Sequence, residues 1–329
     1  MLKQIQELYN ESILSEAMKL YGIDKNQLKE LGALESFVFE YVTDGHSYIL
    51  KITHSFRRTL NDIRGEIEWL NYLYDSGINV SRAVSSQKGN LVEAISAGDS
   101  YFLVIAYEKA EGSLVTEENW NGQLYEKWGQ LMGQIHSASK RYKAKDKTFK
   151  RAEWYEDDQL NVEKYLPPAE SKVIEKSYNL IARLKSLPKD INSYGLIHGD
   201  FHQRNFFLKE GNITVFDFDD SQYDWFVNDI AIALYYAIWW NLKKGCNKVY
   251  FAKDFYTNFM KGYNKENKIE SYWLKQIPDF LMLRHILVFV ILHQIFDMNN
   301  LSEKEKELVT RIKYEIENEV PLVDIEFSN

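Results

Sequence analysis

The spacing of apolar residues changes near Gly112, and this change limits the folds open to the chain. Before Gly112, residues 37–42 and 47–52 are rich in β-branched and aromatic side chains, and they are joined through Asp44-Gly45. Two such runs around an Asp-Gly pair are typical of a β-hairpin. After Gly112, apolar residues recur at helical spacing over long stretches. The sequence therefore predicts an α+β fold with a small antiparallel sheet in front and a larger, mainly helical part behind.

The same patterns place individual elements. In the front part, helices are expected over 2–21, ended by Gly22, and over 57–74, with further strands within 83–95 and over 101–107. In the rear part, helices are expected over 117–138, 169–186, 228–244, 248–262, 268–296 and 302–318, and short strands interrupt them within 196–220. We therefore expect an N-terminal lobe of residues 1–108 and a C-terminal lobe of residues 109–329.

Composition excludes several classes of protein. Hydrophobic residues make up 45% of the chain and charged residues 27%, which is ordinary for a globular protein. The formal net charge of −8 gives no general attraction to a phosphate backbone, so nucleic acid is not an expected partner. Cys246 is the only cysteine, which excludes an intramolecular disulfide and a zinc site built from several thiolates. We expect a cytoplasmic protein that acts as a monomer.

Two stretches of the sequence can each be interpreted in two ways. Residues 277–296 are the most apolar part of the chain, yet they contain Asp279, Arg284, His285 and His293. A membrane-spanning helix needs about 20 largely uncharged residues, so a buried core helix is the better interpretation and no membrane is expected. The stretch 140–151 holds seven Lys or Arg residues. A solvated loop explains it best, and a surface for an anionic substrate or partner is the alternative.

One motif carries most of the functional information. His198-Gly199-Asp200 is followed by Asn205, and Asp217 follows the strand-like residues 213–216. Phosphoryl transfer needs one carboxylate that orients an attacking hydroxyl, together with an amide oxygen and a second carboxylate that hold Mg²⁺ against nucleotide phosphates. The spacing matches the kinase loop H-R-D-x-x-x-x-N and the later D-F-G ligand, with Gly in place of the Arg.

With this motif the chain resembles the aminoglycoside phosphotransferase / choline kinase family, over about residues 20–300. It is also similar to that family's homoserine-kinase-like and bacterial stress-response kinase branches. The resemblance implies a protein-kinase-like two-lobe fold and an enzyme that uses ATP and Mg²⁺. It implies that Asp200 is the catalytic base and that Asn205 and Asp217 hold the metal. It also implies that His198 and Asp229 support the catalytic loop, while His136 is a packed helix-end residue.

Three further residues are candidates for substrate contacts. Asp219 follows the metal ligand at a position that the family typically fills with an acidic residue, so it is expected to assist the metal or the substrate. Arg204 is expected to meet either a phosphate or a nearby carboxylate. Tyr223 is a candidate for the border of the acceptor pocket.

The resemblance also implies a nucleotide site in the front lobe. Lys51 lies on the second hairpin strand, where a kinase-like lobe places its phosphate-binding lysine. Its expected partner is Glu66, because Glu66 lies beside the apolar positions of its helix, whereas Glu68 lies on a mostly polar face. A carboxylate beside a buried face needs a cationic partner.

The phosphate loop departs from the kinase pattern. No G-x-G-x-x-G lies between Gly32 and the hairpin. We expect Ser36 and neighbouring backbone N–H groups to meet the phosphates instead. The strand containing Ile105 and Tyr107 is expected to run into the hinge whose backbone pairs with adenine.

The sequence leaves the acceptor open. We expect transfer of the γ-phosphoryl group of ATP to a hydroxyl of a small molecule, such as an amino alcohol, an amino sugar or a homoserine-like compound. A protein Ser/Thr kinase is the alternative, and a nucleotide-binding regulatory pseudokinase is a further one. The metal motifs of a metallophosphoesterase are incomplete, and no G-x-x-x-x-G-K-[ST] loop is present.

Overall fold

The computed structural model describes residues 3–33, 35–241 and 247–328. These residues form two compact units. The first unit contains residues 1–113, 142–151 and 206–219, and the second contains residues 114–141, 152–205 and 220–329. The lobe boundary between residues 108 and 109 stays a prediction, and the two units are described separately below.

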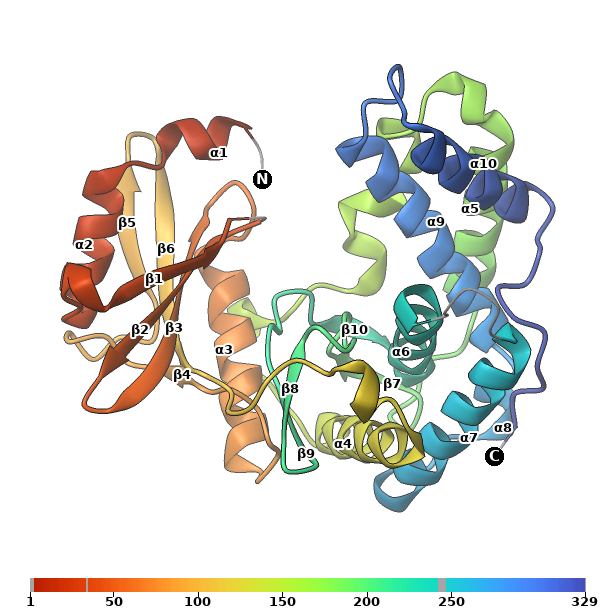
Figure 1. Ribbon diagram of the computed structural model, residues 1–329, viewed down its shortest axis with the longest axis horizontal. Helices are drawn as coiled ribbons and strands as arrows, with labels where there is room; N and C mark the ends of the chain where they lie inside the picture. The colour runs from red at the N-terminus through yellow and green to blue at the C-terminus, as the bar shows by residue number, and fades with distance from the viewer. Residues whose placement is uncertain (1–2, 34, 242–246, 329) are drawn as a thin grey trace. The chain divides into compact units, whose positions relative to one another are not determined.

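An antiparallel sheet forms the centre of the first unit (Figure 1). Its strands lie in the order β1-β2-β3-β6-β4, and β5 also pairs with β6. They are β1 (Leu28–Gly32), β2 (Phe37–Thr43), β3 (His46–His54), β4 (Ala83–Val84), β5 (Glu93–Ala97) and β6 (Ser100–Glu108). The predicted hairpin is confirmed: Asp44 and Gly45 connect β2 to β3, with φ of 51° and 77°. Positive φ at both turn residues is the conformation that suits a two-residue hairpin.

Helices cover both faces of this sheet. They are α1 (Lys3–Leu8), α2 (Glu11–Tyr21) and α3 (Leu60–Asp75), with a 3₁₀ turn at Lys25–Gln27. Residues of α1 and α2 share one core with Leu50, Ile52 and Val104, whereas residues of α3 share a second core with Leu103 and Ile105. Side chains alternate between the faces of a strand, so Lys51 and Tyr107 point to the α3 face.

The two helices predicted in the front part of the chain differ in detail from the observed ones. The expected helix over 2–21 is two helices, because the Asn10 side chain accepts hydrogen bonds from the N–H groups of Ser12 and Ile13 and starts a new helix there. Helix α3 begins at Leu60 because Thr59 and Asp62 form a capping box. Gly22 ends α2 with a φ of 64°, as predicted.

A second hairpin completes the first unit. Strands β8 (Phe206–Lys209) and β9 (Asn212–Val215) pair with each other. The Asn79 side chain donates hydrogen bonds to the Ile213 carbonyl and the Thr214 hydroxyl, over 2.7 and 2.9 Å. These bonds fix the chain just before Asp217.

The second unit is mainly helical, which together with the sheet of the first unit confirms the predicted α+β class. Its 3₁₀ turns lie at Glu117–Asn119, Trp154–Glu156, Asp158–Leu160, Val162–Lys164 and Pro168–Glu170. Its α-helices are α4 (Gly122–Ser139), α5 (Ser171–Lys185), α6 (Phe226–Asn241), α7 (Lys248–Glu266), α8 (Ser271–Leu274), α9 (Ile277–Ile295) and α10 (Glu303–Glu317). Strands β7 (Tyr194–Ile197) and β10 (Gln222–Trp225) pair antiparallel. Residues 242–244 of one predicted helix, and Cys246, lie outside the described residues.

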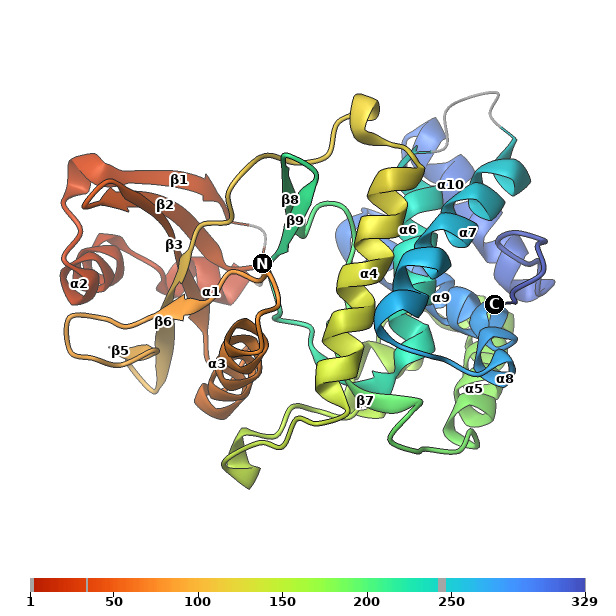
Figure 2. The same ribbon diagram turned by 90° about the horizontal axis from the view of Figure 1, so that it is seen from below.

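Helices α4 and α7 run side by side in close contact (Figure 2). A Cβ atom built on Gly129 would lie 1.9 Å from the Phe259 carbonyl oxygen, and one built on Gly262 would lie 1.8 Å from the Glu126 carbonyl oxygen. Glycine at both positions therefore lets the two backbones approach each other.

The stretch Ser271–Ile295 is long and apolar enough to cross a membrane, by length and composition alone. In its most apolar window, 56% of the residues are buried inside the structure. Such burial is what a core helix of a globular protein shows, so this stretch is weak evidence for a membrane span. The predicted core helix agrees with this burial.

Candidate active site

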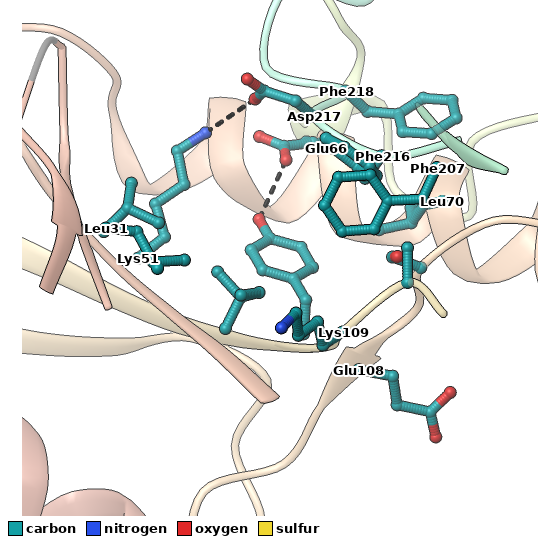
Figure 3. Close-up of a pocket in the computed structure, with 15 residues that line it drawn as sticks. Leu31, Lys51, Glu66, Leu70, Glu108, Lys109, Phe207, Phe216, Asp217 and Phe218 are labelled. Atoms are coloured by element: carbon teal, nitrogen blue, oxygen red, sulfur yellow. Dashed lines mark hydrogen bonds and ion pairs between the residues drawn. The ribbon is translucent and has the colours of Figure 1, made fainter. Parts of the chain in front are cut away.

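A cavity of about 230 Å³ opens on the α3 face of the sheet in the first unit (Figure 3). Its walls are mostly apolar, and the charged residues that line it are Lys51, Glu66, Glu108, Lys109 and Asp217 (Figure 3). The apolar walls come from Leu31, Val38, Ile49, Leu70, Ala110, Phe207, Phe216 and Phe218. Apolar walls with a few polar groups are typical of pockets for flat, partly polar ligands.

Lys51 lies where the sequence predicts it, on β3 at the cavity. Its Nζ atom lies 3.2 Å from Asp217 Oδ1 and 3.8 Å from Asp219 Oδ1. Burial acts to lower the pKa of Lys51, but the two carboxylates raise it above its usual value. The lysine therefore stays charged and points at the residue predicted to bind the metal.

Glu66 is buried on α3, as its place on the apolar stripe predicts. Its Oε1 atom accepts a hydrogen bond of 2.9 Å from the Tyr107 hydroxyl. Glu68 lies on the other side of α3, where it accepts hydrogen bonds from the Tyr142 hydroxyl and the Lys145 backbone. Among the described residues Lys51 pairs with Asp217 and Asp219, and the expected direct Lys51–Glu66 ion pair is not formed. Burial raises the pKa of Glu66, and the charge of nearby Lys51 opposes that rise.

Asp219 is a carboxylate with several cationic partners. It is buried, and Arg57, Arg58 and Lys51 all contact its side chain. Arg151 also donates a hydrogen bond of 2.5 Å to its backbone carbonyl. Burial acts to raise the pKa of Asp219, but these cations hold it well below its usual range. Its predicted role toward metal or substrate stays a prediction, because its carboxylate already has cationic partners.

Sequence reasoning missed Arg57 and Arg58. Arg57 contacts both Glu35, in the turn between β1 and β2, and Asp219. Two consecutive arginines after the lysine-bearing strand were the available signal. Their carboxylate partners lie far away in sequence, so the sequence alone does not show what they bind.

The other predicted nucleotide residues lie in the first unit with different surroundings. Tyr107 lines the cavity, whereas Ile105 is fully buried in the core, in register with Lys51. The Ser36 hydroxyl is buried and has no hydrogen-bond partner among the described residues. Its expected contact with the phosphates stays a prediction. Leu34 of the same loop lies outside the described residues.

Asp200 lies in the second unit, on the loop after β7, and donors surround it. The Asn205 amide donates hydrogen bonds to the Asp200 backbone carbonyl, over 2.9 Å, and to its Oδ2 atom, over 3.1 Å. His202 Nε2 also lies 3.1 Å from Oδ2, and Arg284 binds Oδ1. Burial acts to raise the pKa of Asp200, but Arg284, His202 and His198 hold it well below its usual range. Asp200 is therefore a fixed, ionised carboxylate.

Asp229 fixes the backbone of this loop through hydrogen bonds. Its two carboxylate oxygens accept hydrogen bonds from the N–H groups of His198 and Gly199, over 3.0 and 2.9 Å. His136 is fully buried, with its ring nitrogens 3.1 Å from Asp229 and 2.9 Å from the Tyr263 hydroxyl. These contacts agree with the expected supporting role of Asp229 and with the expected packed His136.

Aromatic rings gather beside Asp200. The rings of Tyr236 and Trp240 stack with their centroids 4.4 Å apart, and His202 packs edge-on against both. The Arg204 guanidinium lies 4.5 Å from the centre of the Trp240 ring. Arg204 is exposed and makes this aromatic contact; its expected contact with a phosphate stays a prediction.

Tyr223 lies on β10, paired with Leu196 of β7. Its backbone carbonyl accepts a hydrogen bond of 2.9 Å from the Tyr194 hydroxyl. Its expected place at the border of an acceptor pocket stays a prediction.

The chemistry of the two predicted metal ligands fits Mg²⁺. The side chain of Asp217 is 51% exposed, so its carboxylate can reach a ligand. Asn205 donates through its nitrogen to Asp200, which leaves its amide oxygen for a cation. Within the described ranges no group of three or more His, Cys, Asp or Glu could hold a metal ion. Magnesium in nucleotide sites needs only one or two such ligands in addition to phosphate and water.

Comparisons with known proteins identify relatives along the whole chain. The model of the phosphotransferase enzyme family (APH) matches residues 27–257. Amicoumacin kinase of Bacillus subtilis (strain 168) is 43% identical over 328 residues, which are 99% of this chain and 98% of that protein.

Solved structures agree with this relationship. Amicoumacin kinase hAmiN, in complex with AMP-PNP, Ca²⁺ and Ami, superposes with a TM-score of 0.97 at 42% identity and covers 99% of both chains. A microcompartment-associated aminopropanol kinase has a TM-score of 0.74 at 18% identity, over 94% of this chain and 95% of that one. The second likeness concerns the fold alone. Together the comparisons confirm the predicted kinase-like fold.

Proposed function

The chain belongs to the phosphotransferase enzyme family, and we propose that it transfers the γ-phosphoryl group of ATP to a hydroxyl group of a small molecule. The observation that carries this proposal is the set of contacts around Asp200. Its carboxylate is held by the side chains of Asn205, His202 and Arg284, on a loop with the spacing of a kinase catalytic loop. A carboxylate held in this way is suited to accept a hydrogen bond from an attacking hydroxyl.

Each polar residue has a role in this proposal. Asp200 orients the acceptor hydroxyl and takes its proton, which contributes about 10²–10⁴-fold to the rate. Lys51 binds the nucleotide phosphates at the charged part of the cavity, while the apolar walls hold the base. Asn205 and Asp217 would hold the divalent cation, which in phosphoryl transfer neutralises the charge that develops on the phosphates.

The relatives support a particular acceptor. The proteins that match over 99% of this chain, at 42–43% identity, are named amicoumacin kinases, and one of them was solved with an ATP analogue and a divalent cation. We therefore propose amicoumacin as the first acceptor to test. The amino alcohols, amino sugars and homoserine-like compounds predicted from the sequence form the rest of the panel. A protein with exposed Ser and Thr residues represents the alternative, a protein kinase.

The test measures ADP release from Mg²⁺–ATP with each acceptor, for the wild type and for Asp200→Asn. We expect turnover with at least one small molecule. We expect the substitution to lower kcat by about 10²–10⁴-fold, because it removes the general base. Thermal stabilisation by Mg²⁺–ATP should be nearly the same in both proteins.

Three outcomes would contradict parts of this proposal. Turnover with the protein acceptor alone would favour a protein kinase. Silence with every acceptor, together with a normal thermal shift, would favour the nucleotide-binding pseudokinase. Absence of a thermal shift with Mg²⁺–ATP would overturn the nucleotide site itself.

A further inference from the structure

Arg284 is a cation within a long, apolar helix of the second unit. It lies on α9, and its side chain is only 16% exposed. The other charged side chains of this helix bind residues away from the catalytic loop: Asp279 pairs with Arg183 of α5, and His285 contacts Glu315 of α10. Arg284 alone among them contacts the catalytic loop, through Asp200. Burial of an arginine is unfavourable unless it is paired with an anion. Asp200 is the anion that pairs with Arg284 here.

The partners of Arg284 define its position. Its Nη2 atom binds Asp200 Oδ1, and the Tyr236 hydroxyl accepts hydrogen bonds from its Nε and Nη2 atoms, over 3.1 and 2.8 Å. The guanidinium also lies 4.8 Å from the centre of the Tyr236 ring. The planar guanidinium with several fixed donors holds its partners more rigidly than an ammonium group does.

Resting on the proposed function, we propose that Arg284 is a positioning residue that fixes the Asp200 carboxylate and directs the acceptor hydroxyl to Oδ1. A carboxylate has about four lone-pair sites, two on each oxygen. His202 and Asn205 both approach Oδ2, and Arg284 approaches Oδ1. The lone pair that remains therefore belongs to Oδ1, so the acceptor hydroxyl binds next to the guanidinium.

Two variants of Arg284 separate position from charge. Arg284→Gln removes both the charge and the fork of donors, so kcat should fall at least tenfold while the KM for ATP stays near the wild-type value. Arg284→Lys keeps the charge and loses the fork of donors. Its kcat should still fall, because small displacements of a catalytic group can cost up to about 10²-fold in rate.

The matched control is Arg183→Gln. Arg183 also pairs with a carboxylate, Asp279 at the start of α9, but away from Asp200. This variant should leave both kcat and the KM for ATP unchanged. If Arg284→Gln behaves like Arg183→Gln, or if its only effect is a lower Tm, Arg284 is not a positioning residue.

A binding measurement separates this inference from the proposed function. Thermal stabilisation by Mg²⁺–ATP should be nearly the same in the wild type, Arg284→Gln and Arg183→Gln, because Arg284 acts on Asp200 and not on the nucleotide. A wild type without turnover on any acceptor would count against the proposed function. A wild type with turnover and an Arg284→Gln variant with full kcat would overturn the inference alone. Should Arg284→Gln fail to fold, Arg284→Lys and Tyr236→Phe are compared in its place. A kcat loss in both variants is then expected, and full kcat in both would overturn the inference.

Discussion

Gly199 stands where a protein kinase loop has arginine, and its backbone explains the difference. Its φ is +80°, in the left-handed region that favours glycine. A Cβ atom at this position would also lie 2.3 Å from the Asp220 carbonyl oxygen. The residue before Asp200 is therefore small because backbone from a later part of the chain occupies the space of a side chain.

We expect Gly199→Ala to move the catalytic loop. Left-handed strain in a non-glycine residue costs about 1–3 kcal/mol, and the contact with Asp220 adds to it. Both the free energy of unfolding and kcat should fall.

The control for this change is Gly211→Ala. Gly211 has a φ of +77°, but a Cβ atom there would meet nothing within 4 Å. Gly211→Ala should therefore lose only the stability that the left-handed strain costs, and its kcat should be unchanged. Equal losses of stability in the two variants, with kcat retained in both, would mean that the Asp220 contact has no effect.

Individual site residues differ in how well the sequence predicts them. Asp200 and Asn205 lie five positions apart on one loop, so their spacing alone predicts that they meet. Helical periodicity predicts that Glu66 lies on the buried face of α3, and the structure places it there. Arg284 lies 84 positions from Asp200. No local pattern connects them, because the contact depends on how α9 packs in the second unit.

At the scale of secondary-structure elements, the close contact between α4 and α7 depends on glycine. A helix interior normally favours alanine over glycine by about 1 kcal/mol. At Gly129, however, a methyl group would lie 1.9 Å from the backbone of α7, which cannot rotate away. The local preference and the packing requirement therefore oppose each other at this position.

We expect Gly129→Ala to destabilise the protein by about 1–3 kcal/mol, the usual cost of overpacking. Gly122→Ala, at the start of the same helix, would meet only the Asn258 side chain at 3.0 Å, which can move. Its effect should stay within about 0.5 kcal/mol. Urea unfolding of both variants measures the difference. If Gly129→Ala instead stabilised the protein, α4 and α7 would be able to move apart without a cost in free energy.

Periodicity predicts the existence of elements better than their ends. The β2–β3 hairpin and helix α3 follow from the sequence because their apolar patterns are regular. The breaks at Asn10 and between α8 and α9 were missed. The first break arises from a capping side chain, and the second lies near Pro278, which occupies the first turn of α9. Such single residues leave the wider apolar pattern intact.

At the scale of the whole molecule, each unit contains some of the residues that predict the function. The first unit supplies Lys51 and Asp217, and the second supplies Asp200 and Asn205. The sequence predicts all four because a single motif spans residues 198–217 and the hairpin lysine has a fixed place in kinase-like chains. The identity of the acceptor depends on a pocket that the motif does not encode.

The dependence of turnover and ATP binding on divalent cations tests the roles proposed for these residues. Removal of divalent cations with EDTA should abolish turnover and reduce the thermal stabilisation by ATP. Asp217→Ala should show the same reduced stabilisation even with Mg²⁺ present, because a carboxylate ligand is lost. Ligand-dependent stabilisation scales with the logarithm of ligand concentration over Kd, so the Tm shift reports the change in affinity. An unchanged Mg²⁺ dependence in Asp217→Ala would remove Asp217 from the metal site.

The most direct test of phosphoryl transfer follows the phosphorus atom itself. ATP labelled at the γ-phosphorus is incubated with the wild type, Mg²⁺ and amicoumacin, and the products are separated. Label in a phosphorylated amicoumacin, absent with Asp200→Asn, is the predicted result. Label found only in inorganic phosphate or on protein, with amicoumacin and every other small acceptor unmodified, would contradict the proposal that the enzyme phosphorylates a hydroxyl of a small molecule.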